Sequence, residues 1–245
     1  MSASRGVSLR PEHSVAVVIP AFNEEKPIGM VLRSLPSHLV DDVVVVDNGS
    51  TDRTAAVAAS LGARVVHEPR RGYGHACLAG IAALREPGVV VFLDGDYSDY
   101  PEDLPSLVSP ILAGEADVVI GSRLRGRRER GAMMPQAYLG NMLATALIWI
   151  LLGFRYTDLG PFRAIRHDRL VELGMSERTF GWTVEMQVKA VQRGYAIREV
   201  PVRYRPRVGR SKVSGSLSGT VRASVGIIST IVRLCVSERW QRRGG

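Results

Sequence analysis

The sequence predicts an α/β fold: a mostly parallel central sheet with helices on both of its faces. Two observations predict it. In the first half of the 245-residue chain, short runs rich in valine and isoleucine alternate with helical patterns, as in folds with a parallel sheet. These runs are apolar on both faces, which is typical of strands covered from both sides. The expected strands are residues 15–19, 43–46, 64–67, 89–93 and 117–120.

Helices are expected between these strands. Ile28, Val31, Leu32 and Leu35 follow the i, i+3, i+4, i+7 spacing of one helix face. Residues 54–61 form an alanine-rich pattern that ends at Gly62, and glycine is the common residue just after a helix. The second half of the chain is different. It contains an arginine-rich loop, an uncharged stretch, a mixed region and a final apolar segment.

Two apolar segments of the second half are candidates for membrane contact. Residues 137–154 are 18 uncharged residues, which as a helix would measure about 27 Å, against a hydrocarbon core of roughly 30 Å. Polar or small residues interrupt this segment, so we expect a helix at the membrane interface or under a partner rather than a crossing one. Residues 217–236 predict an amphipathic helix that serves membrane contact or core packing, and we favour membrane contact. Its apolar stripe is Leu217, Val221, Val225, Ile228 and Val232.

The charge distribution favours phosphate-bearing ligands. The net charge of residues 1–120 is −7, that of residues 121–215 is +11, and that of residues 216–245 is +4. Of the 32 basic residues, 29 are arginine, whose planar guanidinium suits phosphate oxygens. No basic recognition helix or aromatic-interleaved basic strand is present, so we expect a phosphorylated ligand and an anionic membrane surface, and no nucleic acid.

Cysteine and histidine spacing excludes other classes of site. The two cysteines lie 158 positions apart, and the five histidines have no metal-binding spacing, which excludes a disulfide framework and a zinc site of the usual kinds. The first apolar run has five residues, fewer than the roughly 7 to 15 of an export signal. We therefore expect a cytoplasmic protein that associates peripherally with the membrane. Its expected parts are a tail (1–13), one main domain (14–215) and a C-terminal amphipathic extension (216–245).

The strongest chemical signal is the pair Asp94 and Asp96, which directly follows the fourth expected strand. In parallel sheets, ligands bind beyond the carboxyl ends of the strands. Mg²⁺ typically takes one or two carboxylates together with phosphate oxygens, and Ser98 can add a further oxygen ligand. The alternative is an ordinary turn. We favour a metal site made of Asp94, Asp96 and Ser98.

Two other turns are ambiguous on their own. Asp47 follows the second strand, where its carboxylate can accept hydrogen bonds from a ribose or base. Equally, this turn serves only to start the next helix, with Ser50 or Thr51 as its cap. Residues 20–25 have the same two interpretations, because Pro27 favours a helix start. Both alternatives stay open at this stage.

Other nucleotide-binding and hydrolytic motifs fail. Residues 72–77 have the first two glycines of a dinucleotide-binding loop, but Cys77 replaces the last glycine and the segment follows the third strand rather than the first. Close packing or backbone approach to a ligand explains these glycines. The P-loop and the nucleophile-elbow motifs are absent.

The order and spacing of the motifs carry a resemblance to a known family. In the first half these are Pro20-Ala-Phe-Asn-Glu24, Val45-Val-Asp-Asn-Gly-Ser-Thr-Asp52, Asp94-Gly-Asp96 and Gly121-Ser-Arg123. With them the chain resembles the family-2 glycosyltransferases of GT-A fold. The second half resembles the polyprenyl-phosphate (dolichyl-phosphate type) mannose and glucose synthases. The pieces that carry this are Gly140-Asn-x-Leu143, Thr157-Asp-Leu-Gly-Pro-Phe-Arg163, Trp182-x-x-Glu185, Val200-Pro201, Arg207 and Ser211-Lys212.

The resemblance implies a nucleotide-sugar donor of the GDP-mannose or UDP-glucose type and a Mg²⁺ or Mn²⁺ cofactor. Asp94 and Asp96 are the implied catalytic residues, with Asp96 the principal metal ligand. The implied nucleotide-sugar site consists of Pro20, Phe22, Glu24, Val45, Asp47, Asp94, Gly95, Asp96, Arg123, Arg207 and Lys212. The sequence departs from the family pattern at Asn48, at Gly95 and in the spacing of Arg207 and Lys212, which keeps Arg205 as a candidate for the role of Arg207.

The implied acceptor is a polyprenyl phosphate, with Asp158, Arg163 and Glu185 on the acceptor side. A phosphate monoester is already ionised near pH 7, since its second pKa is about 6. We therefore expect a direct inverting transfer of a hexose without a strong general base. The alternatives are a soluble acceptor, and a non-catalytic nucleotide-sugar-binding subunit of a membrane complex. The sequence leaves open whether the chain forms a homo-oligomer.

Overall fold

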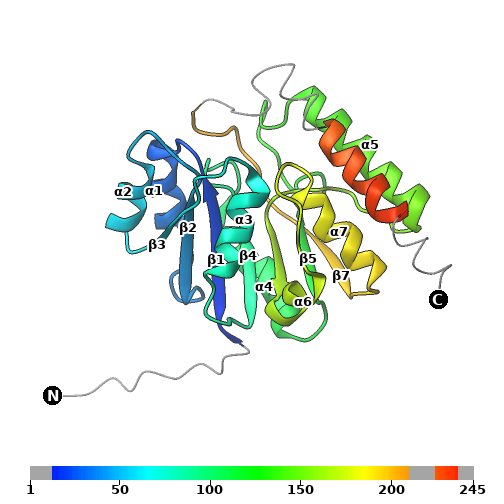
Figure 1. Cartoon of the computed structure of the whole chain (residues 1–245), viewed down its shortest axis with the longest axis horizontal. Helices are drawn as coiled ribbons and strands as arrows, with labels where there is room; N and C mark the ends of the chain where they lie inside the picture. The colour runs from blue at the N-terminus through cyan, green and yellow to red at the C-terminus, as the bar shows by residue number, and fades with distance from the viewer. Residues whose placement is uncertain (1–12, 210–223, 237–245) are drawn as a thin grey trace.

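The centre of the molecule is a seven-stranded sheet, described here by a computed structural model that covers residues 13–209 and 224–236 (Figure 1). The strands are β1 (Val15–Ala21), β2 (Asp42–Asp47), β3 (Arg64–His67), β4 (Val89–Phe92), β5 (Val118–Ser122), β6 (Arg163–Arg166) and β7 (Ile197–Pro201). Their order across the sheet is β3-β2-β1-β4-β6-β5-β7. Only β6 pairs antiparallel with its neighbours. The expected mostly parallel α/β sheet is confirmed.

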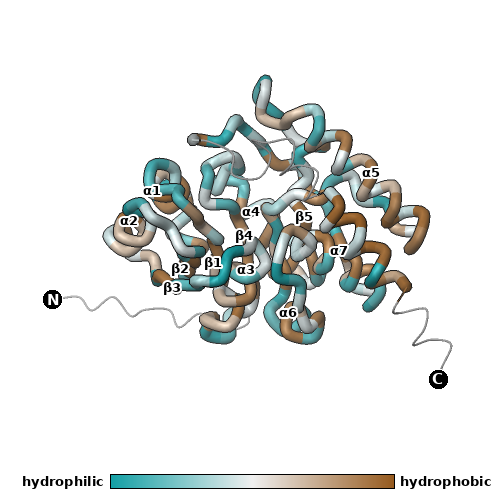
Figure 2. Tube along the Cα trace, turned by 45° about the horizontal axis from the view of Figure 1, so that its top comes forward, coloured by the Kyte–Doolittle hydropathy of each residue, from teal (hydrophilic) through white to brown (hydrophobic). Residues whose placement is uncertain are grey.

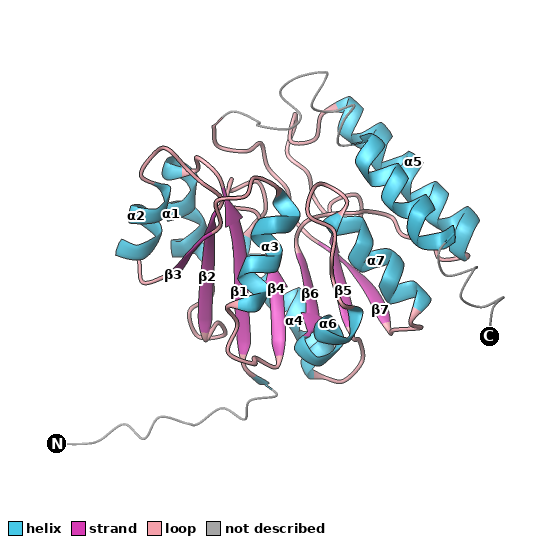
Figure 3. Cartoon of the chain, in the orientation of Figure 1, coloured by secondary structure: helices cyan, strands magenta, loops and turns pink. Residues whose placement is uncertain are grey.

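Helices cover both faces of this sheet (Figure 3). They are α1 (Glu25–Ser34), α2 (Thr54–Ser60), α3 (Tyr73–Ala82), α4 (Leu104–Leu112), α5 (Pro135–Leu152), α6 (His167–Leu173), α7 (Trp182–Gln192) and the helix Ser224–Val236, with a 3₁₀ turn η2 (Pro101–Asp103). Helices α1, α2 and α4 pack on one face, and α3, α6 and α7 on the other. The helix Ser224–Val236 is called the C-terminal helix below.

The five strands expected from the valine-rich runs match β1 to β5 to within two residues at each end. The strands β6 and β7 were not predicted. Both carry charged residues within a short span, and the pattern Arg163-Ala-Ile-Arg166 has no apolar run. Arg163 is nevertheless fully buried. Strand β6 inserts between β4 and β5, so the tertiary structure rather than local hydrophobicity makes it a strand.

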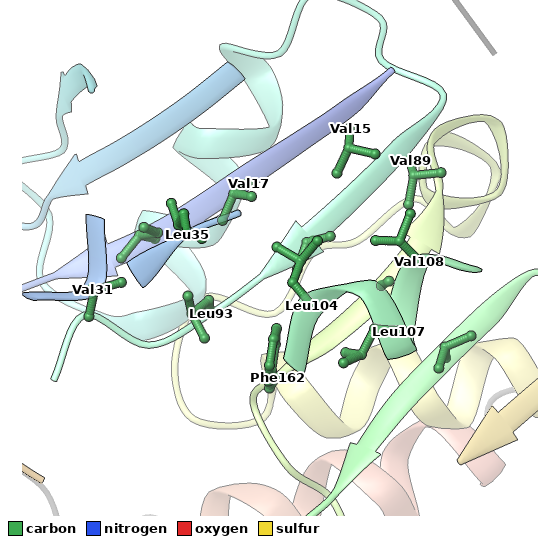
Figure 4. Close-up of a cluster of buried hydrophobic side chains, with 14 of the residues drawn as sticks. Val15, Val17, Val31, Leu35, Val89, Leu93, Leu104, Leu107, Val108 and Phe162 are labelled. Atoms are coloured by element: carbon green, nitrogen blue, oxygen red, sulfur yellow. The ribbon is translucent and has the colours of Figure 1, made fainter. Parts of the chain in front are cut away.

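The core consists of two clusters, one on each face of the sheet. Strand β1 contributes to both, because Val17 faces α4 while Val18 faces α3. Figure 4 shows the α4 side, where Leu104 and Leu107 lie near Phe162 and Val15 lies near Val89. On the other side α3 packs directly onto the sheet: a Cβ on Gly80 would lie 2.4 Å from Cγ1 of Val18. This close contact brings the start of α3 to the carboxyl edge of β1 and β4.

Helix α5 and the C-terminal helix lie side by side at one end of the sheet (Figure 1). Residues of both, such as Ile148 and Ile231, belong to the same core cluster. The outer face of α5 is exposed, and Figure 2 shows hydrophobic stretches along it. Among the described residues, α5 is the one helix whose length and composition would suffice for crossing a membrane, and most of it is not buried in the protein.

The C-terminal helix matches the predicted amphipathic segment where the two overlap. Val225 and Val232 are exposed, and Ile231 and Cys235 are buried against the rest of the protein. Residues 217–223 of the predicted segment, with Leu217 and Val221, lie outside the described residues. The segment therefore both packs on the core and presents an apolar face.

Candidate active site

The carboxyl ends of β1, β2 and β4 open onto a pocket of about 630 Å³. This is the sheet edge at which the sequence predicted chemistry. Predicted site residues in the lining are Pro20, Phe22, Glu24, Asp94, Gly95, Asp96 and Arg207. The lining is completed by Ala21, Asn48, Arg71, Gly72, Tyr73, Ala76, Thr179 and Phe180. The pocket thus collects residues from both halves of the chain.

Asp94 and Asp96 form the acidic centre of the pocket. The Tyr73 hydroxyl donates a hydrogen bond to Oδ1 of Asp94 at 3.0 Å. Oδ1 of Asp96 accepts one from the Ser98 amide at 2.9 Å. Burial of its carboxyl, and then the like charge of Asp96, raise the pKa of Asp94 to about 7. Two carboxylates this close favour a bound cation, which would relieve their repulsion.

The oxygen groups at this corner fit a divalent cation. Ser98 is buried and does not line the pocket, and the predicted contact of its hydroxyl with a cation stays a prediction. Within residues 13–209 and 224–236, no group of three or more His, Cys, Asp or Glu residues could hold a metal ion. A site with two carboxylates and one hydroxyl suits Mg²⁺ or Mn²⁺, since such ions keep water and phosphate oxygens as their remaining ligands.

Arg207 supplies the cationic side of the pocket. Its Nη2 donates to Oε1 of Glu24 at 2.8 Å, and its Nη1 lies 3.3 Å from Oδ2 of Asp96. Its Nε is buried without a hydrogen-bond partner. Because an arginine can bind phosphate oxygens through several N–H groups at once, this side chain is placed to hold an anion beside the acidic pair.

Arg205 has a different position from the one considered for it above. Its guanidinium lies between two aromatic rings, 3.3 Å from the centroid of Tyr97 and 3.9 Å from that of Tyr100. It donates hydrogen bonds to the carbonyl oxygens of Tyr97 and Asp99. These contacts fix the strand-like segment after β7 against the turn after β4, and Arg205 does not line the pocket. Lys212 lies outside the described residues.

The predicted residues Val45 and Asp47 both belong to β2. Val45 is fully buried in β2 and Asp47 does not line the pocket. Oδ1 of Asp47 accepts a hydrogen bond from the Ser50 amide at 2.9 Å, and its Oδ2 lies 3.1 Å from Nδ1 of His67. The predicted contact of Asp47 with the base and ribose of the donor stays a prediction. The same contact of Val45 also stays a prediction; its side chain is buried in the core cluster with α1 and α2.

Asn48, which departs from the family pattern, organises the loop between β3 and α3. Its Nδ2 donates to the carbonyls of Glu68 at 2.9 Å and Arg70 at 2.7 Å, and its Oδ1 accepts from the Gly72 amide at 2.9 Å. An aspartate could not make the first two bonds. The amide therefore sets the position of the residues that follow, Arg71 and Tyr73, in the pocket wall.

Sequence reasoning missed eight lining residues, including Arg71, Tyr73, Thr179 and Phe180. The Arg71 guanidinium stacks 3.6 Å above the ring centroid of Phe22, and both residues line the pocket. Tyr73 holds Asp94 as described above. Thr179 and Phe180 come from the loop between α6 and α7. The glycine-rich segment at Gly72 was the one available signal, and it pointed to a close backbone approach without naming the partner.

The partner of that segment is the loop before α7. A Cβ on Gly74 would lie 2.2 Å from the carbonyl oxygen of Glu177, and one on Gly72 would lie 2.4 Å from that of Arg178. The amides of Gly74 and His75 donate to Thr179 and Arg178 carbonyls at 3.2 and 3.0 Å. The interpretation of these glycines as packing residues is supported by this contact.

Arg123 and Asp158 bind each other rather than the pocket. Asp158 is fully buried. Its Oδ2 accepts from the amide and the Nε of Arg123, both at 2.8 Å, and its Oδ1 accepts from Nη2 at 2.7 Å. This bidentate pair joins the turn after β5 to the loop before β6. Neither residue lines the pocket, and the predicted contact of Arg123 with a phosphate stays a prediction.

Arg163 and Glu185, predicted on the acceptor side, are also buried and paired within the protein. Arg163 Nη1 donates to the Thr183 carbonyl at 2.6 Å. Glu185 accepts hydrogen bonds from the amides of Ser176 and Glu177 and pairs with Lys189 at 2.8 Å. None of the predicted acceptor-side residues lines the pocket, and their contact with an acceptor stays a prediction.

Comparison with known proteins identifies the family of this chain. Residues 16–172 match the family model described as glycosyl transferase family 2. The chain belongs to glycosyltransferase family 2. It is a glycosyltransferase of GT-A fold, which confirms the resemblance found in its motifs.

Two relatives of this family-2 glycosyltransferase match over most of their length. An uncharacterized glycosyltransferase of Mycobacterium tuberculosis is 40% identical over 212 residues, which cover 86% of this chain and 94% of the relative. A dolichyl-phosphate hexose transferase of Haloferax volcanii is 36% identical over 229 residues, which cover 92% and 95% of the two chains.

A solved structure is also similar. Glucosyl-3-phosphoglycerate synthase from Mycobacterium tuberculosis, crystallised with Mn²⁺, UDP-glucose and phosphoglyceric acid, has a TM-score of 0.71 and 28% sequence identity to this family-2 glycosyltransferase. The alignment covers 91% of this chain and 80% of the synthase. The fold of the whole described region is therefore that of a known sugar-transferring enzyme.

The contacts of Asn48 predict the effect of replacing it. Asn48→Asp removes two amide donors and places carboxylate oxygens beside two carbonyls, which should lower the free energy of unfolding by about 1 to 3 kcal/mol and raise KM for the sugar donor. Asn141 is a matched control, since it is a buried asparagine in α5 that bonds the backbone at Thr157 and Leu159 and does not line the pocket. Asn141→Asp should lower stability and leave that KM unchanged. Thermal melts and donor kinetics of both variants check this. Equal KM values for the two variants would contradict it.

The raised pKa of Asp94 predicts a pH dependence of metal binding. Below about pH 7 the carboxyl holds a proton, which a cation must displace. Mn²⁺ affinity should therefore rise as the pH increases from 6 to 8, by about tenfold per pH unit at the acidic end of this range. Above pH 8 the affinity should be constant. Titration calorimetry at several pH values measures the Mn²⁺ affinity. In Asp94→Asn the remaining affinity should be independent of pH over this range, and a flat profile in the native protein would sink the assignment.

Proposed function

We propose that this glycosyltransferase transfers a hexose from a nucleotide sugar to a polyprenyl phosphate, in a Mg²⁺- or Mn²⁺-dependent reaction that inverts the anomeric centre, at the surface of a membrane. The observation that carries the proposal is the composition of the pocket: the acidic pair Asp94 and Asp96 beside Arg207, at the carboxyl edge of the sheet. Its volume of about 630 Å³ lies within the usual range of ligand pockets.

Each part of the pocket suits one part of a nucleotide sugar. The stacked pair Phe22 and Arg71 offers a planar surface for the base. A divalent cation held by Asp94, Asp96 and Ser98 would neutralise charge on the departing diphosphate. Arg207 adds a guanidinium to the same phosphates, and Glu24 orients it. The Mn²⁺ and UDP-glucose named for the similar synthase support this arrangement.

The acceptor needs little activation if it is a phosphate monoester. Its oxygen is ionised near pH 7 because the second pKa of such a group is about 6. The transfer then depends on positioning the two substrates and on stabilising the leaving diphosphate. No residue has to remove a proton from the attacking oxygen. The dolichyl-phosphate hexose transferase among the relatives supports a polyprenyl phosphate as the acceptor.

The exposed face of α5 and the C-terminal helix supports membrane association. On α5, Leu139 is 56% exposed, Leu143 57% and Ile150 72%. Asn141 on the opposite side bonds the backbone of the loop before β6, which holds α5 against the domain. Arg155 stacks on the ring of Trp149 at 4.1 Å, an arrangement suited to the lipid headgroup region. We propose that α5 lies in the plane of the interface and that the protein is peripheral.

A second candidate has its own support. The similar synthase was crystallised with phosphoglyceric acid, a soluble acceptor. A nucleotide-sugar transferase with a small acid acceptor would use the same metal and phosphate contacts, and it would leave the apolar face of α5 without a function. The two candidates differ in whether the protein binds lipid.

Removal of one carboxylate tests the transfer reaction. Asp96→Asn keeps the shape of the side chain and removes its charge, and kcat should fall by about 10²-fold or more, as for loss of one electrostatic group at a reaction centre. The measurement is Mn²⁺-dependent sugar transfer from UDP-glucose and GDP-mannose to a polyprenyl phosphate. Asp168→Asn is the control, because Asp168 is an exposed residue of α6 paired with Arg166. Undiminished metal-dependent transfer by Asp96→Asn would overturn the proposal.

Liposome flotation separates the two acceptors. The native protein should float with anionic vesicles, and Leu139→Glu with Leu143→Glu should abolish this, because charged side chains oppose insertion into the interface. Leu61→Glu is the matched control, an exposed leucine at the end of α2. Native protein that stays unbound and transfers sugar to 3-phosphoglycerate would favour the soluble acceptor instead.

A further inference from the structure

The wall of the pocket formed by Thr179 and Phe180 depends on one carboxylate outside the pocket. Glu177 lies in the loop between α6 and α7. Its Oε1 accepts hydrogen bonds from the amides of Arg178 at 3.1 Å and Thr179 at 3.2 Å, and from the Thr179 hydroxyl at 2.9 Å. One carboxylate oxygen thus fixes both the backbone and the side chain of a pocket residue.

The other oxygen of Glu177 faces the C-terminal helix. Arg233 Nη2 donates to Oε2 at 2.7 Å, and the Thr230 hydroxyl lies 3.5 Å from it. The Glu177 side chain is 15% exposed and Arg233 62%. Burial by itself raises the pKa of Glu177, but the hydrogen bonds from Thr179 and Arg178 and the charge of Arg233 leave it below the ordinary value. Glu177 is therefore ionised at neutral pH and can accept hydrogen bonds from both the loop and the C-terminal helix.

The C-terminal helix also touches the backbone of this loop directly. A Cβ on Gly181 would lie 2.3 Å from the Thr230 hydroxyl oxygen, so only glycine allows the helix to approach so closely. On the far side, the amides that start α3 bond the carbonyls of Arg178 and Thr179. The loop is held between α3, which carries Tyr73, and the C-terminal helix. Because the helix and the loop are in direct contact, a shift of that helix would displace the pocket wall.

From this geometry we infer that Glu177 is a positioning residue for the nucleotide-sugar donor, and that the C-terminal helix sets the shape of the donor pocket through Arg233 and Thr230. This rests on the proposed function in one respect, the identity of the pocket as the nucleotide site. The same helix, which lies beside α5 in Figure 1, exposes Val225 and Val232. A surface that binds this apolar face would thereby be connected to donor binding through the contacts of Arg233 and Thr230 with the loop.

The test uses the full-length protein and two measurements. Hydrogen–deuterium exchange reports on the amides of residues 176–181, and calorimetry gives the Kd of UDP and of GDP with Mn²⁺. Arg233→Ala should increase exchange in that segment and raise the Kd of the nucleotide that binds by roughly twofold to fivefold, the range of one partly exposed ion pair. KM for the sugar donor should rise with Kd while kcat changes little. Arg233→Lys should restore the native KM and Kd. Arg193→Ala, which removes an exposed ion pair with Glu172, should change none of these.

A double-mutant cycle identifies Glu177 as the partner. In Glu177→Gln, which keeps an oxygen for Thr179, Arg233→Ala should have no further effect on Kd or on exchange. Additive effects of the two substitutions would overturn the inference, as would unchanged exchange and Kd in Arg233→Ala. If the native protein binds neither nucleotide, the proposed function fails and the link to the donor fails with it. Exchange in Arg233→Ala then still decides whether the C-terminal helix holds the loop.

Discussion

The structure of the site depends on the repulsion between Asp94 and Asp96 at the end of a buried strand. The two carboxylates are close and largely removed from water, which by itself disfavours their ionised forms. Three neighbours compensate for this: the Tyr73 hydroxyl on one carboxylate, the Ser98 amide on the other, and the guanidinium of Arg207. Tyr73 is the first residue of α3, Ser98 lies in the same turn as the acidic pair, and Arg207 follows β7, so the pair requires these three segments to meet.

Close backbone packing brings these segments together. The chain after β7 lies along the turn after β4, where Arg205 is held between Tyr97 and Tyr100, and this places Arg207 over the acidic pair. On the other side, α3 reaches the site because Gly80 lets it pack directly on the sheet. Electrostatic compensation and backbone packing therefore act together. Neither would bring the arginine and the tyrosine to the carboxylates alone.

Several charged residues that resemble ligand-binding groups in sequence have structural roles. Asp158 holds Arg123, Arg163 donates to the Thr183 carbonyl in the first turn of α7, and Glu185 accepts from the amides of Ser176 and Glu177. Buried charged groups of this kind are costly unless they are paired or hydrogen-bonded. Asp158 and Glu185 each have a cationic partner, and Arg163 donates to backbone carbonyls. Glu185 bonds the start of the loop that carries Thr179 and Phe180, and Arg163 bonds the helix that follows this loop. They stabilise the second half of the domain as the frame on which the pocket wall rests.

The sequence by itself determined the sheet from β1 to β5 and the acidic pair after β4, because strand periodicity and adjacent carboxylates are local patterns. It also determined the family, from motifs in a fixed order. It could not determine β6, whose Arg163 is buried by distant segments, nor the role of Asn48, whose bonds cross from one loop to the next. Thr179, Phe180 and the choice of Arg207 over Arg205 were decided only by tertiary structure. Contacts between residues a hundred positions apart depend on how the elements pack, and no local pattern of residues records that packing.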